Sequence, residues 1–448
     1  MTAPGTQLSS ASDSPPVADP TTAIFDPRDE ATLQCPFDHY ARLRSAAPVH
    51  AIPASWIGRA GEYVFAVSGF DLVAQVVGDW TTFSSQFGTS RSAPPAHLVD
   101  ELRAIAARGY TRPPTMLHAD PPAHTRYRKL VSKAFTPKRV AELTPTIERI
   151  CDELCDVMDA SPPPVDLVAD YAVPIPTRAT ATALGVPDER YRDFKRWADA
   201  EVAAIGRQLS DEAWLTSARE IVELQQYFAA ELEARRREPR DDVLTDLVEA
   251  RLTPEDEVEG EPLSMEEMIS IVQQLQVAGS ETTASLISDM VVVLAHEPGR
   301  WARLASEPDT AGAVVEDMLR LLSPNQGSFR IATADTELAG VPIPKGATLW
   351  IMFGSANRDQ ARFEHADELD PERPGLFQHL AFGRGPHYCL GAPLARLEAT
   401  IALRTLARRY ARIEIVDAAT LRYQPSWILR GLTRLDVRLV RRSEPVAS

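Results

Sequence analysis

Residues 382–391 have the sequence Phe-Gly-Arg-Gly-Pro-His-Tyr-Cys-Leu-Gly, and the apolar spacing of a helix follows directly after them. The stretch places Cys389 in a glycine-rich turn at the start of that helix. The unpaired N–H groups and the positive dipole end of a helix N-terminus favour a thiolate over a thiol. A thiolate in this position acts as a nucleophile or as a metal ligand. The glycines allow the close backbone approach that a large, flat bound group requires.

These ten residues resemble the haem-ligand loop of the cytochromes P450, Phe-Gly-x-Gly-x-His-x-Cys-x-Gly, at every fixed position. The resemblance implies heme b (iron protoporphyrin IX), with Cys389 as the axial thiolate ligand of its iron, which favours O–O bond cleavage. It also implies that His387 contacts a haem propionate, that Phe382 packs beside the sulfur and that Gly391 adjoins the haem. The alternative is a structural cysteine, because free cysteine usually behaves as a small buried hydrophobic residue.

The composition indicates a large apolar core and a strong negative charge. The 448 residues are 44% hydrophobic and carry a formal net charge of −16. Nucleic acid is therefore excluded as a partner class, because phosphate binding requires a basic face. Cys151 and Cys155 lie four residues apart on an expected helix, and we expect reduced core cysteines rather than a shared metal or redox bridge. We expect a monomer in which residues 25–448 form a single cytochrome P450 domain.

Residues 1–24 are rich in Ala, Pro, Ser, Thr and Asp and contain no Lys or Arg, which predicts a disordered leader. They lack the positive start and the apolar run of a signal peptide. No apolar run in the sequence approaches the roughly eighteen residues that span a bilayer. We therefore expect a soluble, cytoplasmic protein without a membrane anchor.

A second stretch, residues 118–128, reads His-Ala-Asp-Pro-Pro-Ala-His-Thr-Arg-Tyr-Arg, and its Asp-Pro-Pro is typical of a helix start. His124 and Arg128 lie four residues apart and share a helix face. The resemblance implies that both hold haem propionates. The alternative is a solvated basic face.

Residues 126–139 contain six Lys or Arg side chains and no acid, which is unusual in so acidic a chain. The resemblance implies that a ferredoxin docks on this basic patch, with an electrostatic steering that salt weakens. The alternative is an ordinary solvated helix, because basic clusters need no partner.

A long helix is predicted from about residue 264 to 297, where Ser264 and Glu267 form a capping box. Its centre reads Ala-Gly-Ser-Glu-Thr-Thr from residue 278 to 283. Glycine in mid-helix costs about 1 kcal/mol relative to alanine. A threonine there can hydrogen-bond to the carbonyl one turn earlier and bend the helix.

This centre resembles the oxygen-activation signature of the same family, Ala-Gly-x-Glu-Thr. The resemblance implies that Thr282 acts in oxygen activation, that Glu281 relays protons, and that Ala278 and Gly279 adjoin the haem. The alternative is a polar patch on a core helix, with Gly279 merely allowing close packing.

A fourth stretch matches the family pattern Glu-x-x-Arg with one departure, because Asp317 stands where glutamate is expected before Arg320. The resemblance implies a buried network of Asp317, Arg320 and Arg373 that supports stability and haem loading. Glu316 lies one helical turn from Arg320 and could compete for it. We expect the shorter acid either to shift the helix slightly or to bond through a water molecule.

Short strands are predicted at residues 328–332, 336–338, 341–343 and 348–353, separated by glycine turns. The resemblance makes Arg330 a further propionate ligand. It also implies a pocket bordered by residues 81–117 and 188–237, and lined by Val277, Phe329, Trp427 and Ile428.

The sequence therefore predicts a mainly α protein with a smaller β region, in which the haem lies between the long central helix and the cysteine loop. We expect a monooxygenase that hydroxylates a lipophilic small molecule of terpenoid, steroid, fatty acid or polyketide type. Electrons would come from NAD(P)H through a ferredoxin reductase and a ferredoxin. The alternatives are a non-catalytic haem-thiolate sensor and a peroxygenase, and the pair Glu281–Thr282 argues against both.

Overall fold

The computed structural model describes residues 25–57, 59, 61–87, 92–205, 209–252 and 260–442. The predicted leader, residues 1–24, lies outside the described residues. Residues 88–91 and 206–208, within the two regions expected to border the pocket, also lie outside them.

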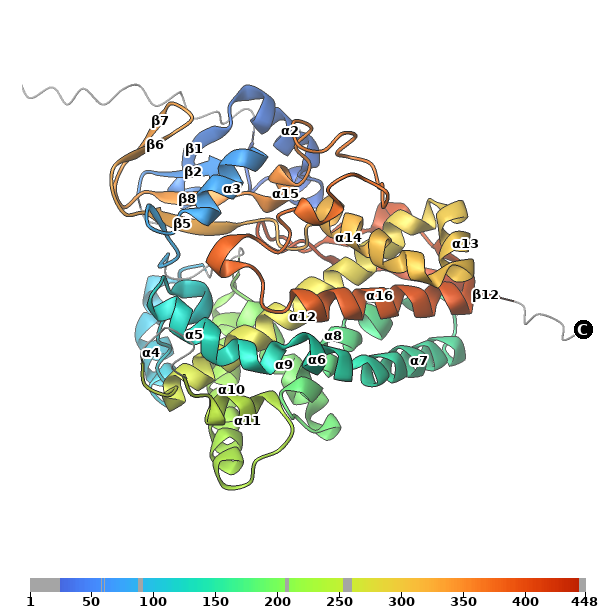
Figure 1. Cartoon of the computed structure of the whole chain (residues 1–448), viewed down its shortest axis with the longest axis horizontal. Coiled ribbons are helices and arrows are strands. Elements are labelled where there is room, and N and C mark those ends of the chain that lie inside the picture. Colours follow the sequence, from blue (N-terminus) through green and yellow to red (C-terminus); the bar gives the residue numbers. More distant parts are fainter. Residues whose placement is uncertain are drawn as a thin grey trace, which may run out of the picture.

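Helices form most of the described chain, and the predicted mainly α fold with a smaller β region is confirmed (Figure 1). Residues Pro137–Glu142 and Thr144–Ala160 form two successive helices, and Pro145 lies in the first turn of the second, where its missing N–H costs nothing. The helices are α1 (Glu30–Gln34), α2 (Phe37–Ala46), α3 (Phe70–Gly78), α4 (Val99–Ala106), α5 (Ala123–Ser132), α6 (Pro137–Glu142), α7 (Thr144–Ala160), α8 (Pro174–Ala183), α9 (Tyr191–Val202), α10 (Asp211–Arg237), α11 (Val243–Glu249), α12 (Met265–Ala295), α13 (Pro298–Ser306), α14 (Ala311–Leu322), α15 (Phe353–Ala356) and α16 (Ala392–Arg409).

A five-stranded sheet lies at the upper left in Figure 1, in the order β1-β2-β8-β5-β3. Strands β2 and β8 are parallel, and the other neighbours are antiparallel. This order places β5, which carries Arg330, between β8 and the N-terminal strand β3. The strands are β1 (Val49–Pro53), β2 (Tyr63–Val67), β3 (Phe83–Ser84), β5 (Ser328–Ala332) and β8 (Thr348–Ile351). The smaller sheets are β4-β12-β9 (Val165–Asp166, Asp436–Arg441, Tyr410–Ile415), β6-β7 (Thr336–Leu338, Val341–Ile343) and β10-β11 (Arg422–Tyr423, Leu432–Arg434).

Helix α12 runs through the middle of the molecule and contacts α8, α9, α14 and α16. The predicted capping box is present, because the Ser264 hydroxyl accepts from the amide of Glu267 and the Glu267 carboxylate accepts from the amide of Ser264. By length and composition α12 alone among the described helices could cross a membrane, but 61% of that apolar window is buried inside the protein. A core helix passes the same test, so this is weak evidence for a span.

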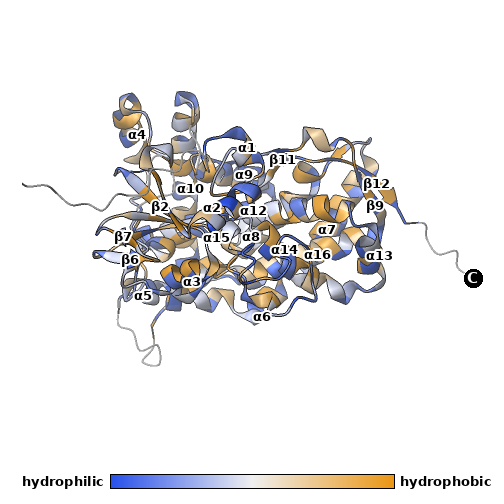
Figure 2. Ribbon diagram, turned by 90° about the horizontal axis from the view of Figure 1, so that it is seen from above, coloured by the Kyte–Doolittle hydropathy of each residue, from blue (hydrophilic) through white to orange (hydrophobic). Residues whose placement is uncertain are grey.

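Helices α7 and α16 show how the apolar pattern forms the core. In Figure 2 hydrophobic and hydrophilic segments alternate along α7 and α16. The buried residues of α7 include Cys151 and Cys155, which are free thiols packed in one cluster with apolar residues of α16. Burial raises the pKa of each thiol to about 12, so both are neutral and unreactive at neutral pH. The interpretation of these residues as reduced core cysteines is confirmed.

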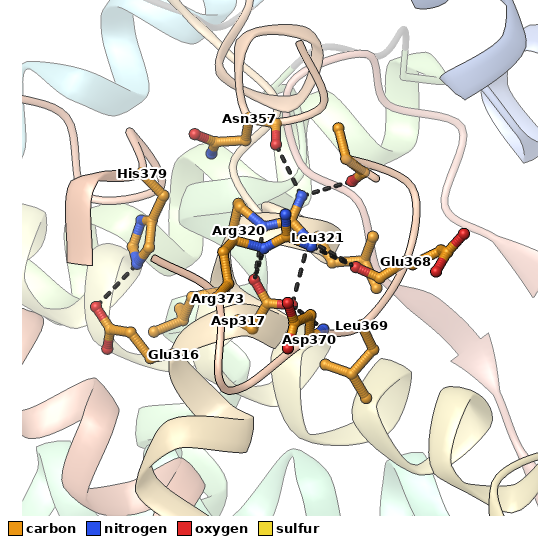
Figure 3. Close-up of polar contacts among 12 residues, drawn as sticks. Glu316, Asp317, Arg320, Leu321, Asn357, Glu368, Leu369, Asp370, Arg373 and His379 are labelled. Atoms are coloured by element: carbon orange, nitrogen blue, oxygen red, sulfur yellow. Dashed lines mark hydrogen bonds and ion pairs between the residues drawn. The ribbon is translucent and has the colours of Figure 1, made fainter. Parts of the chain in front are cut away.

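The predicted network around Asp317 is present and is drawn in Figure 3. Both carboxylate oxygens of Asp317 accept from the Arg320 guanidinium, at 2.6 and 3.2 Å, and both side chains are fully buried. Arg373 adds a contact at 3.2 Å. The amide of Asp370 donates to the second oxygen at 2.6 Å. The shorter acid therefore reaches Arg320 directly, and no bridging water is needed.

The expected competition from Glu316 does not occur, because Glu316 faces the cysteine helix instead. Its carboxylate accepts from Arg396 of α16 at 2.6 and 2.7 Å and pairs with His379 at 2.9 Å (Figure 3 shows the His379 contact). Arginine and histidine together hold the pKa of Glu316 below its usual value against the effect of burial. Two adjacent acids of α14 thus bind segments on either side of the cysteine loop.

We expect Asp317→Ala to destabilise the protein by about 3–5 kcal/mol, because it leaves two guanidinium groups buried without a carboxylate. Chemical denaturation of the purified variant, together with its haem content, measures this effect. Asp309→Ala, at an exposed aspartate shortly before α14, is the control and should change little. Normal stability and haem content in the Asp317 variant would contradict the role of the network.

Candidate active site

Residues 382–391 form a tight loop that leads into α16. The amide of Cys389 donates to the carbonyl of Phe382 at 2.9 Å and closes the loop. Gly383 and Gly385 have φ angles of 66° and 68°, a conformation that other residues adopt only with strain. Because α16 begins three residues after the cysteine, the predicted position of Cys389 at the start of a helix is confirmed.

The electrostatic surroundings of Cys389 differ from the expectation of a free thiolate. Burial raises the pKa of the thiol, while the amides of Gly391 and Ala392 and the charge of Arg128 act in the opposite direction with smaller effects. The sequence argument therefore identified the right hydrogen-bond donors. It did not predict that burial changes the pKa of Cys389 more than these donors do. A coordinated metal cation deprotonates a thiol outright. The loop thus suits a metal ligand better than a free nucleophile.

A cluster of cationic and imidazole side chains surrounds the same loop. It comprises His124 and Arg128 from α5, Arg330 from β5, and His387. The rings of His124 and His387 lie 4.1 Å apart between centroids. Burial, followed by the charge of Arg128, lowers the pKa of His124 to about 4. Burial and the neighbouring cations lower the pKa of His387 to about 3. The structure therefore brings together all four residues that the sequence assigned to haem propionates.

Among the described residues, Asp120 is the acid whose charge acts on His124 and Arg330. Its oxygens are already occupied by the Ser84 hydroxyl at 2.5 Å and the Ser85 amide at 2.8 Å. Burial lowers the pKa of Arg330 to about 10, which leaves the guanidinium charged at neutral pH. The cluster therefore carries excess positive charge, and a ligand with anionic groups would compensate it.

One face of α12 is open although most of the helix is buried. Ala278 is exposed in the middle of the helix, and Thr282 is partly exposed one turn later. The Thr282 hydroxyl donates to the carbonyl of Ala278 at 2.9 Å, as the sequence predicted. Leu275, one turn earlier, packs against the same apolar cluster as Leu390 of the cysteine loop. The open face of α12 and the cysteine loop therefore border one region.

Other residues of the signature face different neighbours. A Cβ added to Gly279 would lie 2.7 Å from the hydroxyl of Thr180 on α8, so this glycine permits the close packing of two helices. That position matches the alternative interpretation of Gly279 rather than contact with a haem. The Glu281 carboxylate accepts from the Gln424 amide at 2.6 Å. Val277 lines a small cavity between α8, α9 and α12, together with Glu281.

These features fit a haem. The loop offers a single sulfur, the cationic cluster offers partners for two propionates, and the exposed Ala278 marks space beside a core helix. No group of three His, Cys, Asp or Glu side chains able to hold a metal occurs among the described residues. A metal held by one protein sulfur and a macrocycle agrees with this donor set.

The sequence model of the Cytochrome P450 family matches residues 208–420. The chain is also 37% identical to "Cytochrome P450 107B1" of Saccharopolyspora erythraea, an alignment that covers 92% of this chain and 96% of that protein. The chain belongs to the cytochrome P450 family. It is a P450 monooxygenase of bacterial type, and the family implies a haem-thiolate cofactor.

Solved P450 structures share this fold. The cytochrome P450 CREJ in complex with (4-ethylphenyl) dihydrogen phosphate matches with a TM-score of 0.83 and 31% identity, over 93% of this chain and 99% of that chain. P450BioI in complex with hexadec-9Z-enoic acid ligated Acyl Carrier Protein matches with a TM-score of 0.77 and 30% identity, over 92% and 99%. The two relatives carry different bound molecules on the same framework.

Three of the four residues assigned to the substrate pocket lie together in this P450. Phe329 and Ile428 are buried in one apolar cluster, and Trp427 packs against it. Val277 instead lines the cavity beside α8 and α9. Phe382 packs below α16, where the Arg396 guanidinium lies 4.5 Å from its ring centroid.

Sequence reasoning missed several residues near the site. Ser85 pairs with His387 at 2.9 Å, and Gln424 holds Glu281. Glu398 of α16 is buried, hydrogen-bonds Thr283 of α12 and has one oxygen without a partner. These contacts join segments far apart in the chain, so no local pattern indicates them.

We expect Cys389→Ala to abolish the thiolate spectrum of the reduced carbon monoxide complex, because it removes the sulfur from the loop. Absorbance spectroscopy of the reduced protein under carbon monoxide measures this. Cys35→Ala is the matched control, since Cys35 is a free and exposed thiol. An unchanged band in the Cys389 variant would exclude this residue as the ligand.

Glu398 gives a pH-dependent prediction. Burial raises its pKa to about 8, well above its ordinary value, so the folded state binds a proton that the unfolded state releases. Stability from this group is therefore present at low pH and is lost as pH rises toward 8, with a slope of at most about 1.4 kcal/mol per pH unit. Glu398→Gln should remove that slope in denaturation measurements between about pH 5 and pH 8. The control Glu307→Gln, at an exposed glutamate, should keep the pH dependence of the unfolding free energy. The same pH dependence in both variants would contradict the prediction.

Proposed function

We propose that this P450 inserts one oxygen atom of dioxygen into a C–H bond of a lipophilic small molecule. The substrate is of terpenoid, steroid, fatty acid or polyketide type. Electrons come from NAD(P)H through a ferredoxin reductase and a ferredoxin, and the protein acts as a cytoplasmic monomer. The observation that carries the proposal is that the cysteine loop and the open face of α12, which carries Thr282, border one region.

The haem, when bound, would supply the oxidative chemistry, and the chain would supply binding, the sulfur of Cys389 and protons. The hydrogen bond to Ala278 holds the Thr282 hydroxyl on the open face of α12. Glu281 adjoins a cavity of about 10 Å³, which has room for one water molecule. We assign Glu281 to receiving a proton from such a water and passing it toward Thr282. Gln424 holds the carboxylate in place.

Ferredoxin docking on α5 and α6 is supported by a smaller patch than the sequence indicated. Arg126 pairs with Glu267 at 2.9 Å, and Arg139 pairs with Asp246 at 2.9 Å. Three of the six cations therefore have an acidic partner within the chain, because Lys138 also lies 4.0 Å from Glu142, although its side chain remains largely exposed. We infer docking on this face with a weaker salt dependence than six free cations would give.

Reconstitution tests the function against its two alternatives. The holoenzyme is supplied with reduced ferredoxin, dioxygen and a substrate that binds. Formation of a hydroxylated product supports the monooxygenase and contradicts the sensor. Product formed with hydrogen peroxide alone, and not with ferredoxin and dioxygen, would favour the peroxygenase instead.

We expect Thr282→Ala to bind substrate normally but to release much of the consumed dioxygen as peroxide. The variant lacks the hydroxyl that would hold a proton on the open face of α12, so proton delivery at that face is no longer controlled. The ratio of product to NAD(P)H consumed measures this uncoupling, and Thr282→Ser should largely restore it. Full coupling in the alanine variant would exclude Thr282 from proton delivery.

A further inference from the structure

Arg59 lies in the loop between β1 and β2, at the end of the molecule where the five-stranded sheet lies (Figure 1). Its amide donates to the carbonyl of Ala54 at 2.9 Å, which fixes the backbone. The side chain points into the apolar cluster that contains Phe87, Phe329 and Ile428. A charged side chain therefore enters the group of residues that the sequence assigned to the substrate pocket.

The guanidinium of Arg59 is only partly satisfied. Nη1 donates to the carbonyl of Phe87 at 3.1 Å. Nη2 is buried and has no hydrogen-bond partner, and no ion pair to Arg59 occurs among the described residues. Burial lowers the pKa of Arg59 to about 10, and no acid opposes this change, so the group is charged but uncompensated at neutral pH.

Aromatic rings frame the free end of this guanidinium. Its carbon atom lies 3.9 Å from the ring centroid of Phe329 and 5.8 Å from that of Phe87. The ring of His118 packs edge-on against Phe87 at 4.9 Å, and its Nδ1 is also buried without a partner. Two buried nitrogen atoms near Phe87 therefore lack hydrogen-bond partners within the described part of the chain.

Several buried arginines of the described chain have carboxylate partners. Arg320 pairs with Asp317, Arg235 with Asp242 at 2.8 Å, and Arg358 with Asp367 at 2.7 Å. Those pairs hold the fold together. Arg59 has no such partner among the described residues, a condition that it shares with Arg330 of the cationic cluster, and a buried guanidinium nitrogen without an acceptor is costly. Such a group fits a ligand whose anion arrives from outside.

We propose that Arg59 binds an anionic oxygen group, a carboxylate or a phosphate, at one end of the substrate. Guanidinium groups bind both anions through paired hydrogen bonds. The cluster around Phe87, Phe329 and Ile428 accommodates the apolar body of the same molecule. The substrate is then an amphiphile held at its charged end, which deepens the proposed function and rests on it.

Spectral titration of the ferric holoenzyme with matched ligands tests this proposal. Dodecanoic acid, dodecyl phosphate, methyl dodecanoate and 1-dodecanol share one apolar chain and differ at the head group. We expect at least one anionic ligand to bind about tenfold more tightly than the neutral ones, because hydrogen bonds to a charged group are stronger. The relative affinity of the acid and the phosphate identifies which anion is bound.

Arg59→Met should bring the anionic and neutral ligands to within about twofold of one another, and Arg59→Lys should retain part of the preference. Arg42→Met, at an exposed arginine in α2, should leave the preference unchanged. Haem content and the carbon monoxide spectrum verify that each variant is correctly loaded. Because binding needs no electron transfer, a failure of turnover does not affect this test.

Three results would overturn the proposal. The first is equal binding of neutral and anionic ligands by the wild-type protein, or binding of none of them. The second is an anion preference that persists in the Met variant. The third is a reduced haem content of the Met variant whose haem-loaded fraction keeps the anion preference, which would assign Arg59 to a haem propionate instead of the substrate.

Discussion

The buried carboxylate of Asp317 is the interaction on which the position of the cysteine loop depends. It binds Arg320 of its own helix and Arg373 of the loop that leads to residues 382–391. Arg320 in turn donates to three backbone carbonyls in the segment from 357 to 368, which has little regular structure of its own. The neighbouring Glu316 binds Arg396 on the opposite side of the cysteine. Two successive acids of α14 therefore hold the chain before and after Cys389, and these contacts determine the position of the sulfur.

The distribution of paired and unpaired charge separates the fold from the site. Several cations that support the fold, such as Arg320 and Arg235, have carboxylate partners within the chain. Around the cysteine loop, by contrast, His124, His387 and Arg330 lie close together with Asp120 as their acidic neighbour, and that acid is occupied by serine donors. Such a region is stable only when an external anion enters it, since a buried charge is costly without a partner. A haem with two propionates supplies that charge, so cofactor binding and local stability are linked.

Much of the architecture could be predicted because its signals are local. The capping box at Ser264, the bond from Thr282 to the preceding turn and the pairing of Asp317 with Arg320 all join residues within four positions. What could not be predicted is the direction in which a helix faces. Gly279 was expected beside the haem, yet it packs on α8 because neighbouring helical positions point about 100° apart. Contacts such as that of Gln424 with Glu281 join residues 143 positions apart, and no local sequence pattern predicts them.

The turn between β10 and β11 brings two parts of the proposed site together. It carries Gln424, which donates to Glu281, and three residues later Trp427, which packs against the cluster around Phe329. The Ser426 hydroxyl lies between them and donates to the carbonyl of Ile205, just after α9, at 3.3 Å. Under the proposed function, one short segment therefore contacts both the apolar cluster assigned to the substrate and the acid assigned to proton delivery. The hydrogen bond of Ser426 ties this segment to the end of α9, so the relative position of Gln424 and Trp427 depends on contacts outside the turn as well.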